Sequence, residues 1–409
     1  MRTVKWNPFL SGGCALLGAM LLWAGAARAD VSSTNAAAIV VFPKILVDTT
    51  TSTTTRTDTL IQLTNTSADP VNVRCFYVNA NGHCSNDATI VCDPAASPAD
   101  TATVCGSSIS FCQPSWQEND FAFTLTSKQP ISWLASEGLL DLPVQIPTTG
   151  GQTNSGSILP VGENPFRGEL KCIEVGDSEL PIDKNDLKGE ATIETVSSTM
   201  ATDGASVDVR SYNAVGIQAI AGAQDGPDGH TGDDTLLIGQ EYNPCPNILV
   251  LDHYFDDVEF HTDVFNSTVR THLTLVPCSE DFNLQAPITT TVQYLVFNEF
   301  EQRFSTSKPV TCFSERVISD IDTRPGDDHD NDAKSMFNVG FEGTLVGQTL
   351  IRGVADSSTT TGHGLLGVAE EFWTKDGGGQ FSDAFSLNQR GTRTQLDVIN
   401  LPAASPPNP

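Results

Sequence analysis

The segment TLIQLTNTSADPVNVRCFY, residues 59–77, shows the pattern that decides the fold of this chain. Two runs of alternating residues lie on either side of a polar stretch, and in an extended chain every second residue of a run points to the same face. That face carries mostly apolar residues: Thr59, Ile61 and Leu63 in the first run, and Val71, Val73, Cys75 and Tyr77 in the second. A period of two is typical of strands with one buried face. Short runs of this kind recur between turn residues, and no long segment has a helical period, so we predict an all-β protein built from sandwiches.

The pattern occurs twice in the same order. Seven short blocks of the first half return in the second half, and their shared order indicates a tandem duplication. The blocks are 45–48 and 248–252, 59–63 and 271–275, 73–79 and 292–298, 126–132 and 306–311, 166–170 and 341–345, 187–191 and 365–369, and 211–216 and 386–391. The matched positions are mainly apolar residues and glycines, which set a core and its bends. We expect the copies to superpose, with Phe166 over Phe341 and Gly189 over Gly367.

The repeat sets the predicted domain limits. We expect two tandem immunoglobulin-like β-sandwich domains that arise from an internal duplication, at residues 36–220 and 245–400, joined by an exposed linker at 221–244. A Pro-rich tail follows at 401–409. The first copy has 46 residues between Asn79 and Thr126, and the second has 7 between Asn298 and Thr306. The excess is a Cys-rich insertion at about 80–125, which we interpret as a decorated loop, with a partner-binding lobe as the alternative.

Residues 1–29 have the layout of a secretory signal peptide. Arg2 and Lys5 precede a short apolar run, and Ala27-Arg28-Ala29 is a cleavage site. We therefore expect a bacterial protein that is periplasmic or extracellular and has no transmembrane segment in its mature chain. With 50 acidic and 22 basic residues, the formal net charge is −28. Such a charge disfavours nucleic acid as a partner, so we expect a protein or a glycan.

Nine cysteines follow residue 29, and in an exported protein they indicate disulfides. Cys245 stands just before the strand expected at 248–252, and Cys278 just after the one at 271–276. On the assumption that these strands are antiparallel neighbours, the two cysteines meet, and we predict a Cys245–Cys278 disulfide. In the first copy we expect Cys75 to pair with Cys172. Cys312 is then the unpaired thiol, and a Cys278–Cys312 bond is the alternative.

One acidic segment has the spacing of a calcium loop. Asp328, Asp330 and Asp332 follow the D-x-D-x-D pattern, whose carboxylate oxygens suit calcium. Ala333 stands where such a loop needs glycine, and Val339 stands where it needs the closing glutamate. We therefore expect a solvent-exposed acidic loop at 320–332, with calcium binding as the alternative.

A second polar cluster consists of His253, Asp257, Glu259 and His261. The last three share one face of a strand, which fits a metal or proton-transfer site, and exposed strand polarity fits it equally well. The sequence has no zinc helix, no nucleophile elbow and no phosphate-binding glycine loop.

These patterns favour an exported, non-enzymatic structural or binding protein without a cofactor. One alternative is a secreted hydrolase with a site between the domains. Another is a calcium-dependent adhesion or carbohydrate-binding module. A periplasmic chaperone made of two sandwiches is less favoured, because the sequence shows no basic anchor for a partner's carboxylate.

Overall fold

The computed structural model describes residues 31–52, 54–94, 98–139, 157–198, 206–222, 234–256, 258–261, 266–322, 335–337, 343–355, 362–375 and 379–403. Within these ranges the chain is nearly all β, with strands β1 to β25, one short helix α1 and one 3-10 turn η1 (Ile318–Ile321). The predicted signal peptide lies outside the described residues. Among the described residues, no helix is both long enough and apolar enough to cross a membrane.

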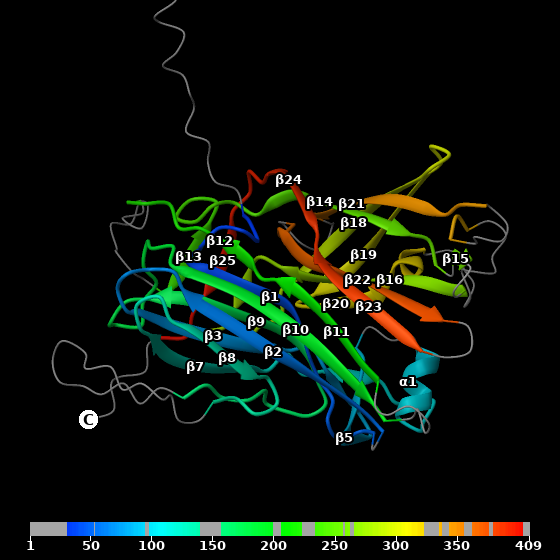
Figure 1. Cartoon of the computed structure of the whole chain (residues 1–409), viewed down its shortest axis with the longest axis horizontal. Coiled ribbons are helices and arrows are strands. Elements are labelled where there is room, and N and C mark those ends of the chain that lie inside the picture. Colours follow the sequence, from blue (N-terminus) through cyan, green and yellow to red (C-terminus); the bar gives the residue numbers. More distant parts are fainter. Residues whose placement is uncertain are drawn as a thin grey trace, which may run out of the picture.

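A first unit consists of two antiparallel sheets (Figure 1). Its strands are β1 (Ile39–Val47), β2 (Thr55–Asn65), β3 (Val71–Asn79), β7 (Glu118–Leu125), β8 (Pro130–Leu134), β9 (Phe166–Val175), β10 (Leu187–Ser197), β11 (Ser206–Asn213) and β12 (Val215–Ile217). The sheet orders are β12-β1-β9-β3-β7 and β11-β10-β2-β8. The alternating apolar residues, such as Ile61 and Leu63 of one sheet and Val73 and Tyr77 of the other, are buried in one shared core.

A second unit also consists of two antiparallel sheets. Its strands are β14 (Pro246–Tyr254), β15 (Val258–His261), β16 (Asn266–Pro277), β18 (Thr289–Asn298), β19 (Arg303–Thr311), β20 (Ser314–Val317), β21 (Val346–Val354), β22 (Leu365–Lys375), β23 (Gln380–Ser386) and β24 (Asn388–Thr392). One sheet has the order β19-β18-β21-β14-β24. The other has the order β15-β16-β22-β23, and β20 also pairs with β16. Leu273 and Leu275 of one sheet share a core with Val292 and Val296 of the other.

The strands of the two units follow the same order. The order β12-β1-β9-β3-β7 of the first unit corresponds to β24-β14-β21-β18-β19 of the second, and β11-β10-β2-β8 corresponds to β23-β22-β16-β20. In the described ranges, the second unit has one additional strand, β15, which also pairs with β16. Gly189 of β10 faces Leu63, and Gly367 of β22 faces Leu275. The sequence match between these two glycines therefore agrees with the pairing registers.

A cross-strand Asn–Gly pair also occurs in both units. Asn79 faces Gly168, and Asn298 faces Gly347. Gly168 thus takes the place of Gly347, whereas the sequence match had assigned it to Gly343. Phe341, the predicted counterpart of Phe166, lies outside the described residues.

Three further sequence blocks are misaligned. Pro130 begins β8, whereas its predicted counterpart Pro309 lies on β19. The first and last blocks are shifted along their strands, since Leu249 takes the place of Val40, and Ser386 that of Asn213. A pattern with a period of two matches itself again after every second residue, so short blocks cannot fix the register.

The insertion forms a small sheet of its own with the order β5-β4-β6. It contains β4 (Gly82–Cys84), β5 (Asp87–Cys92), α1 (Pro98–Val104) and β6 (Cys112–Pro114). Two disulfides, Cys84–Cys105 and Cys92–Cys112, tie it together. We predicted that the insertion ends at about residue 125, but its last strand ends at Pro114. The following strand, β7, pairs with β3 and belongs to the core of the first unit.

A third element joins the units, the bridging sheet of β13 (Thr235–Ile238), β25 (Asp397–Asn400) and β17 (Glu280–Asp281). Leu236 and Ile238 of β13 are fully buried, so the end of the predicted exposed linker is a core strand. The start of the predicted tail is also held, because Leu401 is buried and Arg74 donates a hydrogen bond to the Pro402 carbonyl (2.9 Å).

The units also meet directly along β11 and β23, which run side by side in Figure 1. Asp208 of β11 accepts a hydrogen bond from the Ser382 amide of β23 (2.9 Å). Nearby, Lys44 of β1 and Arg210 of β11 both bind the carboxylate of Glu370 on β22. All three side chains are almost completely buried, so this ion network lies inside the junction.

The disulfides include both predicted pairs. Cys75 and Cys172 face each other across β3 and β9, with their Cα atoms 4.1 Å apart. Cys245 is joined to Cys278. The assumption behind that second pair was wrong, however, because β14 and β16 lie in different sheets of the second unit. The bond therefore links the two sheets. Cys312 is buried and makes no disulfide.

Candidate functional site

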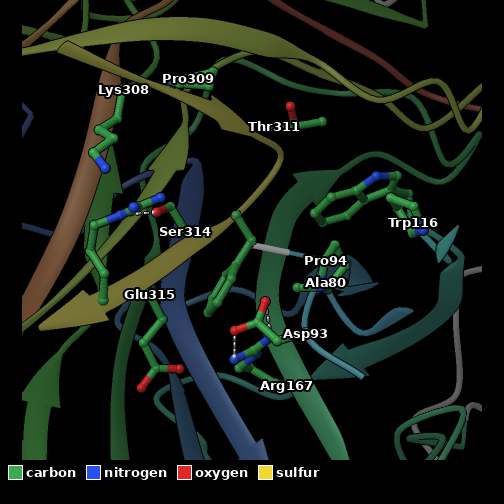
Figure 2. Close-up of a pocket in the computed structure, with 13 residues that line it drawn as sticks. Ala80, Asp93, Pro94, Trp116, Arg167, Lys308, Pro309, Thr311, Ser314 and Glu315 are labelled. Atoms are coloured by element: carbon green, nitrogen blue, oxygen red, sulfur yellow. Dashed lines mark hydrogen bonds and ion pairs between the residues drawn. The ribbon is translucent and has the colours of Figure 1, made fainter. Parts of the chain in front are cut away.

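A cleft of about 370 Å³ lies where the insertion and β9 of the first unit meet β19 and β20 of the second. In the view of Figure 2, Lys308 lies at one end and Trp116 at the other, with Arg167 and Asp93 between them. The cleft is built from segments that are far apart in the sequence. Only the packing of the two units brings them together.

Two cations of the second unit face the cleft, and neither forms an ion pair with a residue in the described ranges. Lys308 is on the edge strand β19, and Arg316 is on β20, where its Nε donates a hydrogen bond to Ser314 Oγ (3.0 Å). Among the residues that the structure describes, no carboxylate lies within ion-pair distance of either cation. Burial, followed by the positive charge of Arg316, lowers the pKa of the Lys308 ammonium, and the negative charges of Asp320 and Asp322 offset part of this effect. A bound anion would relieve the remaining repulsion.

Arg167 adds a third cation from β9 of the first unit. It forms an ion pair with Asp93 of the insertion (2.8 Å), and its guanidinium lies over the ring of Phe313, 6.0 Å from the centroid. The Nε atom of Arg167 is buried and has no hydrogen-bond partner. An arginine with an unused donor is well suited to bind a carboxylate or a phosphate.

Apolar side chains form the remaining walls of the cleft. They come from Pro94, Pro114, Trp116, Pro309 and Phe313. The backbone of Trp116 is held at a φ of 44°, which is uncommon for a residue other than glycine. The cleft thus combines flat apolar surface with positive charge, the usual combination in a ligand site.

Glu315 lines the same cleft, but its carboxylate points away toward the buried junction. It accepts a hydrogen bond from Lys44 Nζ at 2.5 Å, and Figure 2 shows it turned away from Lys308. Glu315 therefore does not neutralise Lys308 and Arg316. Three basic side chains, Arg167, Lys308 and Arg316, thus line one cleft of a chain that is strongly acidic as a whole.

Asp328, Asp330 and Asp332 of the predicted calcium loop lie outside the described residues. The start of the loop expected at 320–332 is described, and it is not solvent-exposed throughout, because Ile321 ends the turn η1 and both Ile321 and Asp322 are buried. Two groups of potential metal ligands occur within the described ranges, and both consist mainly of cysteines: Cys84, Cys92 and Cys105 in one, and Cys245, Cys278 and Asp397 in the other. All of these cysteines are in disulfides, so neither group supplies a thiolate.

The histidine cluster is also not assembled in the described part of the chain. Asp257 and the side chains of Glu259 and His261 lie outside it. His253 is buried, with its ring nitrogens bonded to Thr349 Oγ1 and the Tyr254 carbonyl, both at 2.9 Å. Burial lowers the pKa of His253 to about 4, so it is neutral at pH 7. It lines a second cavity of about 500 Å³ beside Asp252, Glu299 and Glu371.

Sequence reasoning missed the cationic cleft. Arg167, Lys308 and Arg316 form no linear motif, so the sequence shows no basic anchor for a partner's carboxylate. The one local signal was Lys308-Pro309, because lysine and proline are common on edge strands. Comparison with known protein families and with curated proteins finds no match for this chain.

Proposed function

We propose that this protein is an exported, non-enzymatic binding protein, and that the cleft between its two units binds an anionic ligand. The observation that carries the proposal is that Lys308 and Arg316 face a half-apolar cleft and form no ion pair with any residue that the structure describes. A cation with no protein counter-ion is available to a ligand, and its charge-assisted hydrogen bonds are strong in a partly desolvated site. The disulfides of the insertion and both units support the export part of the proposal.

We further infer that the units are immunoglobulin-like β-sandwiches that arose by duplication of one ancestral domain. The matching order of nine strands supports this, as do the Gly189/Gly367 and Asn–Gly equivalences. Even the side-chain turns agree, because Asn79 Oδ1 accepts a hydrogen bond from the amide of Asn81, and Asn298 Oδ1 accepts one from that of Phe300. The cleft is lined by different elements of the two units, so its residues can differ between the copies and can bind a ligand without disturbing the shared fold.

The proposal is tested by calorimetric titration of the mature chain with citrate, a small polycarboxylate. We expect binding that weakens at least about tenfold, or about 1.4 kcal/mol, when Lys308→Gln and Arg316→Gln are combined. Lys188→Gln is the matched control, because Lys188 is an exposed lysine on β10 and its substitution changes the net charge in the same direction.

Two results would contradict anion binding in the cleft. One is the absence of heat from citrate at low salt. The other is equal binding by the wild-type chain and the double variant, which would place the anion elsewhere. A weakening of the same size in Lys188→Gln would show that only the overall charge matters.

A further inference from the structure

The edge strand β19 leads directly into the cationic cleft. β19 is nine residues long and pairs with β18 along one side. In the described part of the chain, no strand pairs with its other side. An open edge of this length offers a row of backbone hydrogen-bonding groups to another extended chain.

The pairing shows which backbone groups face outward. The amide of Cys312 donates to the Ile288 carbonyl, and that of Asn298 donates to the Gln302 carbonyl, so residues 302 and 312 are bonded toward β18. Bonding alternates along an antiparallel pair, so the odd-numbered residues Arg303, Ser305 and Ser307 direct their backbone groups outward. Pro309 falls in this outward set, where its missing N–H breaks no bond to β18.

The end of this open edge coincides with the two unpaired cations. Lys308 and Pro309 of β19 line the cleft, and Arg316 of β20 lies on the same wall. A chain that pairs with Ser305 and Ser307 and continues toward Pro309 therefore reaches the cations after a few residues. If the chain ends there, its terminal carboxylate can pair with Lys308 and Arg316, which have no ion pair among the described residues.

We propose that the ligand is the carboxyl-terminal segment of an extended polypeptide, which adds as a strand to the outer edge of β19 and places its terminal carboxylate between Lys308 and Arg316. The inference rests on the proposed anion-binding function of the cleft and specifies its ligand. Since the carboxylate lies at the Lys308 end, the added strand runs parallel to β19. Main-chain bonds supply affinity in this mode, and the carboxylate fixes the register.

Three synthetic peptides test the inference. Each has the fluorophore-labelled sequence Ser-Thr-Val-Thr-Val-Thr, with a free carboxylate, a carboxyl-terminal amide, or a free carboxylate and N-methyl groups on alternate residues. Anisotropy titrations are expected to show binding of the first peptide, at least tenfold weaker binding of the amide, and no binding of the methylated peptide. The Lys308→Gln/Arg316→Gln variant should bind the acid no better than the amide, whereas Lys188→Gln should bind it as the wild type does.

The outcomes separate this inference from the broader proposal. If citrate binds in the cleft and none of the peptides does, anion binding stands and the polypeptide ligand is wrong. Equal binding of the acid and the amide would show that the terminal carboxylate is not bound by Lys308 and Arg316. Equal binding of the methylated peptide would show that the peptide does not add to β19 as a strand. If neither citrate nor peptide binds, both ideas fail.

Discussion

Glu370 is the residue on which the junction between the units depends most. Its carboxylate is 1% exposed and binds both Lys44 and Arg210, which are themselves buried and pair in addition with Glu315 and Asp208. The attraction of these two cations outweighs the effect of burial and lowers the pKa of Glu370. Breaking a buried pair from one side is costly, because the remaining charge stays in a medium that cannot solvate it.

We therefore expect Glu370→Gln to lower the free energy of unfolding by about 3–5 kcal/mol. The measurement is urea denaturation at pH 7 followed by circular dichroism. Glu371→Gln is the matched control, since the neighbouring carboxyl is half-buried, faces Asp383 and has a raised pKa. That variant should keep or slightly raise the stability. Similar losses in the two variants would mean that the buried network does not carry the junction.

At the scale of the strand, the repeated Asn–Gly pair shows why glycine is needed. A Cβ atom added at Gly168 would lie 1.9 Å from the Val78 carbonyl oxygen, and one added at Gly347 would lie 2.9 Å from the Phe297 carbonyl oxygen. Val78 and Phe297 immediately precede the paired asparagines. The two units thus use the same close approach between backbones at the same place.

Gly168→Ala and Gly347→Ala should each destabilise the protein by about 1–3 kcal/mol, because the strands must separate to admit a methyl group. The loss should be larger for Gly168, where the clash is with a closer oxygen. Gly162→Ala, at a position with open space around it, should be close to neutral. Chemical denaturation of the three variants measures this order, and a neutral Gly168→Ala would refute it.

The alternating pattern predicts elements well and their placement poorly. It identifies the strands around Ile61 and Val73 because a half-buried strand has a period of two. It cannot distinguish a register from one shifted by an even number of residues, which is why Gly168 was matched to Gly343 and not to Gly347, four residues further on. It also missed β13, since Leu236 and Ile238 are buried by the bridging sheet and sit in a stretch that is mostly polar. The alternating pattern could not predict the cleft, because a local sequence pattern carries no information on how two units pack against each other.

For the whole molecule, buried carboxyls predict a stability that depends on pH. Burial is the largest cause of the raised pKa of Glu118, to about 7, and of Glu174, to about 8. Burial also raises the pKa of Glu169, whose neighbour Lys171 opposes the shift. These folded-state pKa values exceed the value near 4.3 of an unfolded glutamate. The folded state therefore binds more protons between about pH 4.5 and pH 8.

The free energy of unfolding should accordingly fall as the pH rises from about 5 to 8, by at most about 1.4 kcal/mol per pH unit for each such carboxyl. Urea titrations across this range measure the slope. Adding about 1 M salt should reduce the contribution of surface charge repulsion to this slope, because charges are then screened over about 3 Å. Glu174→Gln should reduce the slope of the free energy of unfolding against pH that remains in the presence of salt. A slope that salt abolishes entirely would show that surface repulsion alone controls it.

The order in which the chain is made gives the buried ion network a further meaning. Lys44 leaves the ribosome long before Glu315 and Glu370, so a first unit that closed early would bury this lysine without either of its two ion-pair partners. The same unit would also lack Val368 and Ala384, which complete its core from the far side of the junction. A chain that ends before residue 368 would therefore lack part of this core, and we expect limited proteolysis to cut it faster than the full-length protein.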